Sequence, residues 1–235
     1  MADGPADQSA RVRVGYNVVS RAYRADTADE ATQRQYAEWL GHVRERFPAG
    51  GDLLDLGCCN GIPTAKWLSD KGFRVTGVDL SDTMVERARG LVPGATFLRG
   101  NVTDIGEVDF DAATFDAVVS FYALIHVPVT DQPGVIERLA RWLRPGGIFV
   151  ATVGHTAWSG TDTDWLGGGA EMLWSHPECE LSRVDRVGRT HDRRRAHCAR
   201  RRKRAHAVRC HPPALTELGH SARRSPAKTR RTAAD

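Results

Sequence analysis

The strongest constraint on the fold is an alternation of two sequence patterns along the first 153 residues. Short apolar runs that end near glycine or aspartate are typical of buried strands. Between them, apolar side chains recur every three to four residues, as they do in amphipathic helices. This alternation predicts a doubly wound, Rossmann-like α/β sheet, mostly parallel, with helices on both faces. The expected strands are residues 53–56, 74–78, 95–98, 115–121 and 148–153, and the expected helices are residues 32–47, 64–71, 81–91 (with Ser81 as N-cap) and 135–143, the last followed by a turn over residues 144–147.

The segment between the first strand and its following helix is a glycine turn. Residues 53–63 read Leu-Leu-Asp-Leu-Gly-Cys-Cys-Asn-Gly-Ile-Pro. Gly57 and Gly61 permit a tight turn and a close approach of the backbone to a ligand. Asp55 precedes the turn, where its carboxylate is suited to accept hydrogen bonds from a cationic or amide-bearing ligand. Taken alone, such a turn is more often ordinary turn chemistry than a binding site.

Two further carboxylates follow the next two strands. Asp79 stands at the end of the second strand, where an acidic side chain can accept hydrogen bonds from both hydroxyls of a ribose. Asp104 follows the third strand and is suited to accept from an adenine amino group. Each could be a solvated cap, but three carboxylates on successive strands favour an adenosine-containing ligand. The pattern Gly-x-Gly-x-x-Gly is absent, so a pyrophosphate site is poorly supported.

In this order, the motifs resemble those of the class I S-adenosylmethionine-dependent methyltransferases. The resemblance runs from about residue 12 to residue 175. It rests on residues 53–61 (similar to the first family motif, Asp-x-Gly-x-Gly-x-Gly), 75–79 (the second), 101–104 (the third), 115–121 (the fourth) and 143–147 (Leu-Arg-Pro-Gly-Gly before a strand).

The resemblance implies how the cofactor S-adenosylmethionine is held. Asp55 and Gly57 are expected to hold its methionine part. Asp79 is expected to hold the ribose, and Asp104 the adenine. The other residues expected at the cofactor are Ser120 and Phe121 along the far wall, with Tyr16, Tyr23, Cys59, Gly61, Leu80, Met84 and Asn101.

One position departs from the family pattern. Cys59 stands where the family usually has glycine, and its Cβ is expected to crowd the approach of backbone to cofactor. A redox or metal role for Cys58 and Cys59 is disfavoured, because no distant Cys or His stands at ligand spacing. We expect no metal.

The methyl acceptor is expected between the strand ends and the N-terminal segment. Residues 13–23 resemble the helical lid of small-molecule methyltransferases, with Tyr16 and Tyr23 facing the cofactor or, alternatively, packing in the core. His126 and His155 follow the fourth and fifth strands, as candidate bases or as residues that orient their loops. Residues 158–174 hold three tryptophans and Gly-Gly-Gly, which predicts an aromatic cover or core packing. The expected acceptor is a small organic molecule, such as a natural-product hydroxyl or amine.

Charge divides the chain into an acidic body and a basic tail. Residues 1–182 hold 16 Lys and Arg against 25 Asp and Glu, a net −9, whereas residues 183–235 hold 17 against 4, a net +13. The expected organisation is a helical lid (1–50), a cofactor-binding domain with the acceptor loop (51–176) and a basic tail with little stable structure (177–235). The antiparallel strands that close the sheet in relatives are therefore expected to be missing or disrupted.

Three interpretations of the tail remain open: a frameshift near residues 176–182, a solvated tail, and a nucleic-acid-binding arm. Read from the second base of each codon, residues 182–190 permit Arg-Glu-Trp-Thr-Glu-Leu-Ala-Gly-Leu, an amphipathic helix. Residues 204–209 permit the strand Gly-His-Thr-Leu-Phe-Val, and residues 215–216 permit a stop. The tail lacks interleaved aromatic residues, so specific binding of nucleic acid is not expected.

Composition excludes other classes of protein. The longest apolar runs, such as residues 148–153, are too short to span a bilayer, and no secretory signal is visible at the first residues. Five cysteines, an odd number, do not indicate a disulfide framework, so a cytoplasmic protein is expected. The alternatives to a methyltransferase are a nucleotide-dependent oxidoreductase and a non-enzymatic RNA-binding module that uses the tail. The oligomeric state is left open.

Overall fold

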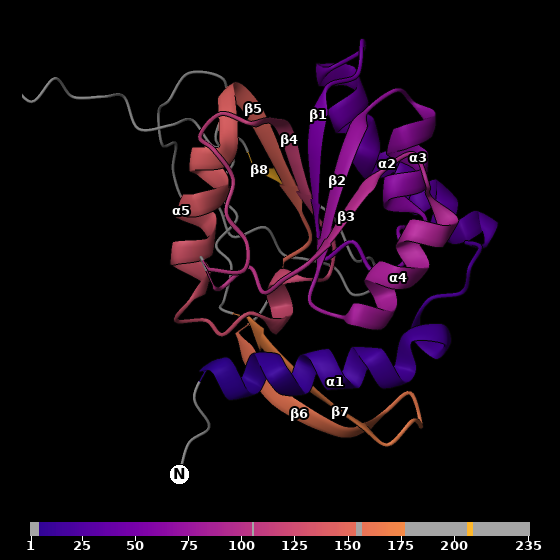
Figure 1. Ribbon diagram of the computed structural model, residues 1–235, viewed down its shortest axis with the longest axis vertical. Coiled ribbons are helices and arrows are strands. Elements are labelled where there is room, and N and C mark those ends of the chain that lie inside the picture. The colour runs from indigo at the N-terminus through magenta and orange to yellow at the C-terminus, as the bar shows by residue number, and fades with distance from the viewer. Residues whose placement is uncertain (1–4, 105, 154–156, 177–205, 209–235) are drawn as a thin grey trace, which may run out of the picture.

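A central sheet organises the molecule (Figure 1). The computed structural model describes residues 5–104, 106–153, 157–176 and 206–208. The sheet has the strand order β3-β2-β1-β4-β5-β8, in which the first five strands are parallel and β8 is antiparallel to β5. Its strands are β1 (Asp52–Leu56), β2 (Arg74–Asp79), β3 (Thr96–Arg99), β4 (Phe115–Ser120), β5 (Leu143–Ala151) and β8 (His206–Val208).

Helices cover both faces of this sheet, as Figure 1 shows, and this confirms the predicted doubly wound fold. Helices α2, α3 and α4 pack on one face and α5 on the other. Because side chains alternate along a strand, Leu53 joins the core under α2, α3 and α4, and Leu54 joins the core under α5. The helices are α1 (Pro5–Tyr23), α2 (Glu30–Arg46), α3 (Thr64–Asp70), α4 (Asp82–Leu91), the 3-10 turn η1 (Leu124–His126) and α5 (Gln132–Trp142).

Local sequence signals explain where the helices begin. The Ser81 side chain accepts a hydrogen bond from the backbone N–H of Met84 at 3.1 Å, which confirms Ser81 as the N-cap of α4. In the same way, Asp29 accepts from the backbone N–H of Thr32 at 2.9 Å and caps α2. None of the helices in the described part of the chain has the length and apolar character needed to cross a bilayer.

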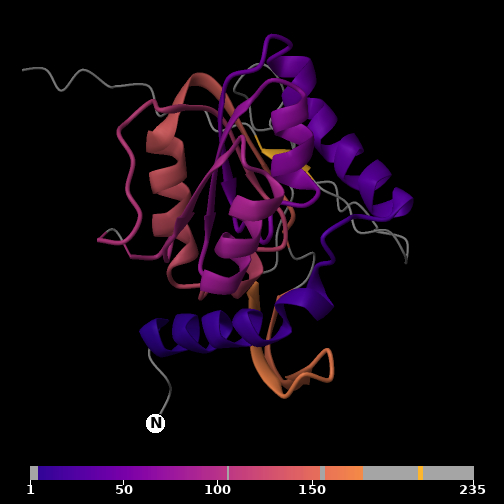
Figure 2. The ribbon, with the colours of Figure 1, turned by 45° about the vertical axis from the view of Figure 1, so that its right-hand side comes forward.

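A helix and a hairpin close the carboxyl end of the parallel strands. Figures 1 and 2 show α1 lying across this end, with the hairpin of β6 (Trp158–Trp165) and β7 (Ala170–His176) against it. Gly15 of α1 allows this close approach, because a Cβ at Gly15 would lie 2.6 Å from the carbonyl oxygen of Glu171. The Glu171 carboxylate also pairs with Arg11 at 3.2 Å. The segment expected as an aromatic cover is thus an antiparallel hairpin.

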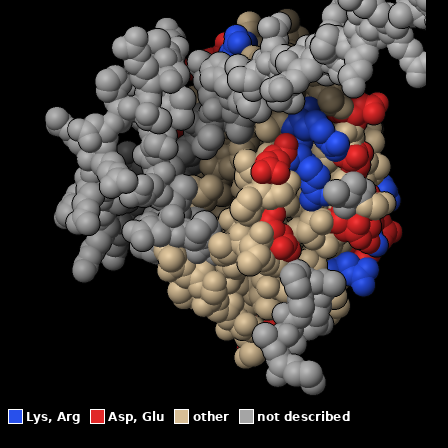
Figure 3. Space-filling view, turned by 90° about the vertical axis from the view of Figure 1, so that its left-hand side faces the viewer, with Lys and Arg blue, Asp and Glu red and all other residues tan. Residues whose placement is uncertain are grey.

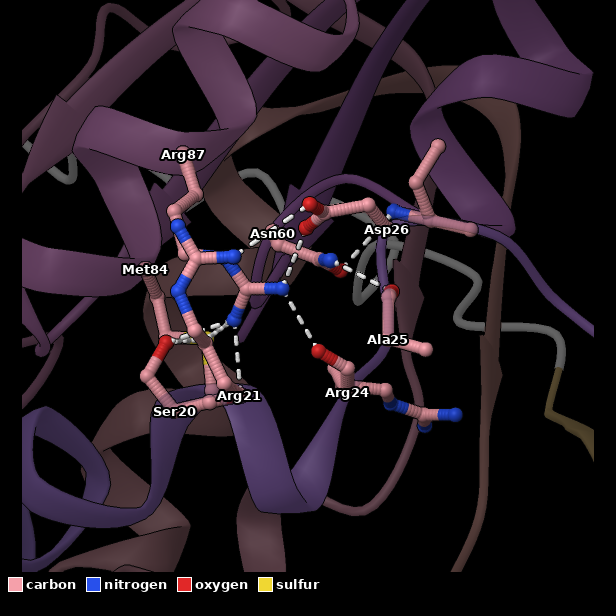
Figure 4. A network of polar contacts seen from close by, with 9 residues as sticks. Ser20, Arg21, Arg24, Ala25, Asp26, Asn60, Met84 and Arg87 are labelled. Atoms are coloured by element: carbon pink, nitrogen blue, oxygen red, sulfur yellow. Dashed lines mark hydrogen bonds and ion pairs between the residues drawn. The ribbon is translucent and has the colours of Figure 1, made fainter.

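A buried arginine of α4 fixes the other end of α1 (Figure 4). Arg87 donates through Nη1 to the carbonyl oxygen of Ser20 at 2.7 Å and through Nη2 to that of Arg24 at 2.6 Å. Arg87 Nη2 also pairs with Asp26 at 2.6 Å. A guanidinium on the last carbonyls of a helix satisfies its unpaired acceptors and complements its dipole. Asn60, from the turn after β1, donates to a backbone carbonyl of the segment that follows α1.

One of two expectations at the end of the sheet needs revision. Residues 144–147 were expected as a turn, but they belong to β5, with a register shift against β4 and a left-handed φ of +81° at Gly146. At the outer edge, three residues of β8 pair with Phe149, Val150 and Ala151. Within the described residues, β8 is the sheet's one antiparallel strand, and its three residues agree with the expectation that the closing strands are missing or disrupted.

Candidate functional site

A cavity opens where the carboxyl ends of β1, β2 and β4 meet α1. This is where a doubly wound sheet binds ligands, since the strand order reverses between β1 and β4. The cavity has an empty volume of about 720 Å³, which includes space open to solvent. Of the predicted site residues, it is lined by Tyr16, Tyr23, Gly57, Cys59, Asp79, Leu80, Asn101, Phe121 and His126.

The glycine turn forms the floor of this cavity. Gly57 has a left-handed φ of +76°, and its N–H donates to the carbonyl of Val78 at 2.7 Å, which ties β1 to β2. A Cβ at Gly57 would lie 2.1 Å from the Cβ of Ala123, so any other residue would displace the segment after β4. Glycine is therefore required here both for its conformation and for its lack of a side chain.

Asp79 connects the glycine turn with the start of α4. Its Oδ2 accepts from the backbone N–H of Cys59 and its Oδ1 from that of Ser81, each at 2.8 Å. Burial raises the pKa of Asp79 to about 6, and these backbone hydrogen bonds oppose the rise. Each carboxylate oxygen keeps a further lone pair, so Asp79 can accept from a ligand that enters the cavity.

Two buried polar atoms near the cavity have no hydrogen-bond partner among the described residues. They are Oδ2 of Asp55, near the end of β1, and Oγ of Ser120, at the end of β4. Burial, then the charge of Asp79, raises the pKa of Asp55 to about 8. A buried polar atom without a partner costs free energy, so each calls for a ligand group that completes it.

Cys59 adopts a conformation that favours glycine. Its φ of +51° is left-handed, and its side chain lines the cavity. Burial raises the pKa of the Cys59 thiol to about 12, so the thiol is neutral. Neighbouring Cys58 is buried in the core and also carries a free thiol. No three His, Cys, Asp or Glu side chains gather as metal ligands in the part of the chain described.

Five predicted cofactor residues lie outside the cavity lining: Asp55 and Ser120, described above, and Met84, Gly61 and Asp104. Met84 is fully buried under α1, where its sulfur accepts from the Ser20 hydroxyl at 3.1 Å. A side chain at Gly61 would meet the core residue Val92. Asp104 is exposed, and its Oδ1 accepts from the backbone N–H of Gly106 at 2.8 Å. Its contact with adenine stays a prediction.

His126 and Tyr16 form a hydrogen-bonded pair in the wall of the cavity. Nδ1 of His126 lies 2.7 Å from the carbonyl oxygen of Leu173, and Nε2 lies 2.7 Å from the Tyr16 hydroxyl. Burial lowers the pKa of His126 to about 4, so the ring is neutral at pH 7. His155, the other candidate base, lies outside the described residues.

Aromatic rings surround this pair. The ring of Tyr16 contacts those of Tyr23 and Trp165, with centroids 5.2 and 5.3 Å apart. Trp174 of β7 lies 4.7 Å from the imidazole of His126 and 5.6 Å from Trp165. Trp165 and Trp174, from the segment predicted as an aromatic cover or as core packing, thus pack against Tyr16 and His126.

Arg24 is a residue that the sequence reasoning missed. Its guanidinium lies over the rings of Tyr23 and Tyr36, and Nη2 donates to the Tyr36 hydroxyl at 2.5 Å. Its Nε is buried with no hydrogen-bond partner among the described residues, and its charge acts on Cys59 and Asp55. The sequence feature that pointed to Arg24 was its position directly after residues 13–23, which resemble the lid helix.

Fold and cavity together place the candidate site at the carboxyl ends of the parallel strands of a doubly wound sheet, where such sheets bind ligands. Residues 54–151 match the family of methyltransferase domains. The matched residues run from β1 to β5, and the order of their motifs is similar to that of the class I S-adenosylmethionine-dependent methyltransferases.

Three comparisons illustrate this similarity. The chain is 36% identical over 124 residues to the 27-O-demethylrifamycin SV methyltransferase of Amycolatopsis mediterranei, covering 52% of this chain and 44% of the relative. It is 32% identical over 136 residues to the sterol 24-C-methyltransferase of Yarrowia lipolytica, covering 55% and 34%. The crystal structure of the PH0226 protein of Pyrococcus horikoshii OT3 has the same fold, with a TM-score of 0.53 and 21% identity over 67% of this chain and 80% of that one. The chain thus spans less than half the length of these two curated relatives.

Proposed function

We propose that this protein transfers a methyl group from S-adenosylmethionine to a small organic acceptor. The observation that carries the proposal is the pair of buried carboxylates, Asp55 and Asp79, on either side of the Gly57 turn. Asp55 keeps a buried oxygen without a partner, and Asp79 lines the cavity. The two relatives are named for rifamycin and sterol methylation, which supports a small organic acceptor without identifying it.

The charges around the turn suit the amino-acid part of this cofactor. Asp55 offers an unpaired carboxylate oxygen to an ammonium group, and Arg24 offers an unpaired Nε to a carboxylate. In a site of low dielectric, a negative and a positive side chain attract the two charges of a zwitterion more strongly than hydration in water does. Asp79 is placed to bind the ribose. Thr103 and Asn101 line the cavity beside it, where they extend the surface for the nucleoside.

When bound, S-adenosylmethionine supplies a methyl group on a sulfonium, an activated electrophile that needs no metal. The protein's contribution is therefore to align the acceptor, to exclude water and to remove a proton where the acceptor carries one. Helix α1 and the β6–β7 hairpin cover the strand ends and exclude water. His126, neutral and lining the cavity, is our proposed base, and His155 remains a second candidate.

Calorimetric titration tests the cofactor. We expect S-adenosylmethionine and S-adenosylhomocysteine to bind the purified protein and NAD not to bind. Asp79→Asn removes one negative charge and is expected to weaken binding at least tenfold, or about 1.4 kcal/mol. Asp70→Asn is the control, because Asp70 pairs only with Lys66 on the surface of α3 among its described contacts.

Two results would overturn the proposal. Binding of NAD in place of S-adenosylmethionine would identify the oxidoreductase alternative. Equal binding by the Asp79 and Asp70 variants would place the cofactor elsewhere. The bases are tested separately: unchanged turnover after replacement of both His126 and His155 would remove them from the mechanism.

A further inference from the structure

The wall around His126 contains a hydrogen-bond chain with a fixed direction. A carbonyl oxygen only accepts, so the Nδ1 atom that faces Leu173 must carry the proton of the neutral imidazole. Nε2 is then an acceptor, and the hydrogen bond of 2.7 Å to Tyr16 must be donated by the Tyr16 hydroxyl. The chain therefore runs from Tyr16 through His126 to Leu173 and has one possible polarity.

This polarity decides what Tyr16 presents to a ligand. Its one O–H is used on His126, so its oxygen faces its other neighbours with lone pairs alone. Burial, and next the neighbouring phenol of Tyr23, raises the pKa of Tyr16 well above its ordinary value, so this hydroxyl is neutral. The Tyr16 oxygen keeps lone pairs for a further hydrogen bond, and both Tyr16 and His126 line the cavity. At the Tyr16 oxygen, the cavity wall can accept a hydrogen bond from a ligand.

The rest of the wall carries almost no charge. Among the described residues that line the cavity, Asp79 is the only one with a formal charge, and it already accepts from two backbone N–H groups. On the acceptor side the lining residues from α1 and η1 are apolar or aromatic, apart from Ser9 and the hydrogen-bonded pair Tyr16 and His126. Figure 3 shows a lower surface with few Lys, Arg, Asp or Glu, where α1 and the hairpin lie in Figure 1. A charged acceptor would find no counterion here, which favours a neutral one.

We propose that Tyr16 and His126 form a proton relay for a neutral acceptor with a phenolic hydroxyl. This inference rests on the proposed methyl transfer and specifies the class of its acceptor. The acceptor hydroxyl donates to the oxygen of Tyr16. As the acceptor oxygen bonds to the methyl carbon, the sulfonium sulfur keeps the electron pair of the breaking C–S bond. The acceptor proton moves to Tyr16, and the Tyr16 proton moves to Nε2 of His126. The products are a methyl ether, a neutral thioether and an imidazolium.

The relay selects an acidic hydroxyl over an aliphatic one. A buried imidazole whose pKa is lowered to about 4 is a weak base, so it removes a proton efficiently only from a hydroxyl that releases it readily. Phenols meet this requirement much better than aliphatic alcohols. The protein's own Tyr16 shows that a phenolic O–H lies at hydrogen-bond distance from Nε2, edge-on to the imidazole.

Binding of simple probes tests the acceptor class. Phenol, cyclohexanol and benzoate are titrated into the protein saturated with S-adenosylhomocysteine, with heat as the readout. We expect phenol to bind at least tenfold more tightly than cyclohexanol or benzoate. Phenol binding no tighter than that of either competitor would overturn the inference while leaving the proposed function intact. Failure of S-adenosylhomocysteine itself to bind would instead overturn the proposed function, and the inference with it.

Two variants test the relay. His126→Asn retains an N–H for Leu173 and removes the Nε2 acceptor, and Tyr16→Phe retains the ring and removes the hydroxyl. Each is expected to lower turnover of phenol about a hundredfold, but turnover of a nitrophenol, whose more acidic hydroxyl needs less help from a base, less than tenfold. His42→Asn, an exposed histidine of α2, is the matched control. A merely structural role would lower both turnovers equally, and equal losses in the Tyr16 variant would overturn the relay even if the His126 variant failed to fold.

Discussion

At the residue scale, Asp55 shows how a binding group lowers the stability of the ligand-free protein. Its folded pKa of about 8 lies above the unfolded value of about 3.9, so the folded state holds the proton more tightly. The resulting stabilisation is complete below the unfolded pKa and is lost as pH rises from about 4 to about 8. Asp79, with a pKa of about 6, adds a change of the same sign. Below pH 6.5 the lowered pKa of His126 acts in the opposite sense.

We therefore expect Asp55→Asn to stabilise the ligand-free protein at pH 8 by about 1–3 kcal/mol, because an amide buries no charge. Near pH 4 the variant and the parent are expected to unfold at nearly the same temperature. Thermal unfolding across this pH range checks the prediction, with Asp70→Asn as the exposed control. Affinity for S-adenosylmethionine, measured alongside, should fall. A variant less stable than its parent at pH 8 would show that the Asp55 carboxylate is satisfied in the fold.

The sequence predicted the residues of the site unevenly, for physical reasons. Gly57 and Asp79 lie in the turn and strand end that their motifs define, so local pattern was sufficient to place them. Whether Asp104 faces a cavity depends on the path of the loop after β3, which no local pattern encodes. Arg24 was missed because its role depends on Tyr36 and Cys59, which are distant in the chain.

At the element scale, the contact between α1 and β7 is where sequence reasoning reached least far. Strands β1, β2 and β4 are apolar runs that any parallel sheet would bury, and their periodicity predicted them. The hairpin has mostly exposed residues in β6, and its packing depends on α1, which lies far away in sequence. Its partner surface could be found only in the folded chain.

A pair of glycine variants tests this contact. Alanine is favoured over glycine within a helix by about 1 kcal/mol, so Gly41→Ala in α2, with no atom within 4 Å of the new Cβ, is expected to stabilise the protein. Gly15→Ala is expected to destabilise it, because the new Cβ would lie 2.6 Å from the carbonyl oxygen of Glu171 and 3.0 Å from Cε of Met172. Hydrogen exchange of the α1 amides, measured with thermal unfolding, should be faster in the Gly15 variant alone. Equal behaviour of the two variants would show that α1 and β7 are not packed this closely.

At the scale of the whole molecule, the described residues leave one edge of the sheet only partly paired. β5 has nine residues, of which three pair with β8. An edge strand with unpaired N–H and C=O groups invites association between molecules. β8 also lies in the segment with a net charge of +13, opposite in sign to the body. Among the described residues, the pairing of the sheet is therefore incomplete at its β5–β8 edge, on the far side of β4 from the glycine turn.

The position of β8 bears on the frameshift hypothesis, because His206–Val208 lies within the codons, 204–209, whose second-base frame permits the strand Gly-His-Thr-Leu-Phe-Val. We predict that the gene, read in that frame from about codon 182, encodes an amphipathic helix, then this strand, then a stop. A protein with the carboxyl-terminal sequence of that frame should pair more residues of β5. Its unfolding temperature should rise by about 2–4 °C for each kcal/mol by which its free energy of unfolding increases. Gene sequencing decides the first part, and calorimetry with light scattering of the two proteins decides the second. A second-base frame without helix and strand would end the hypothesis, and equal unfolding temperatures would show that the edge is already satisfied.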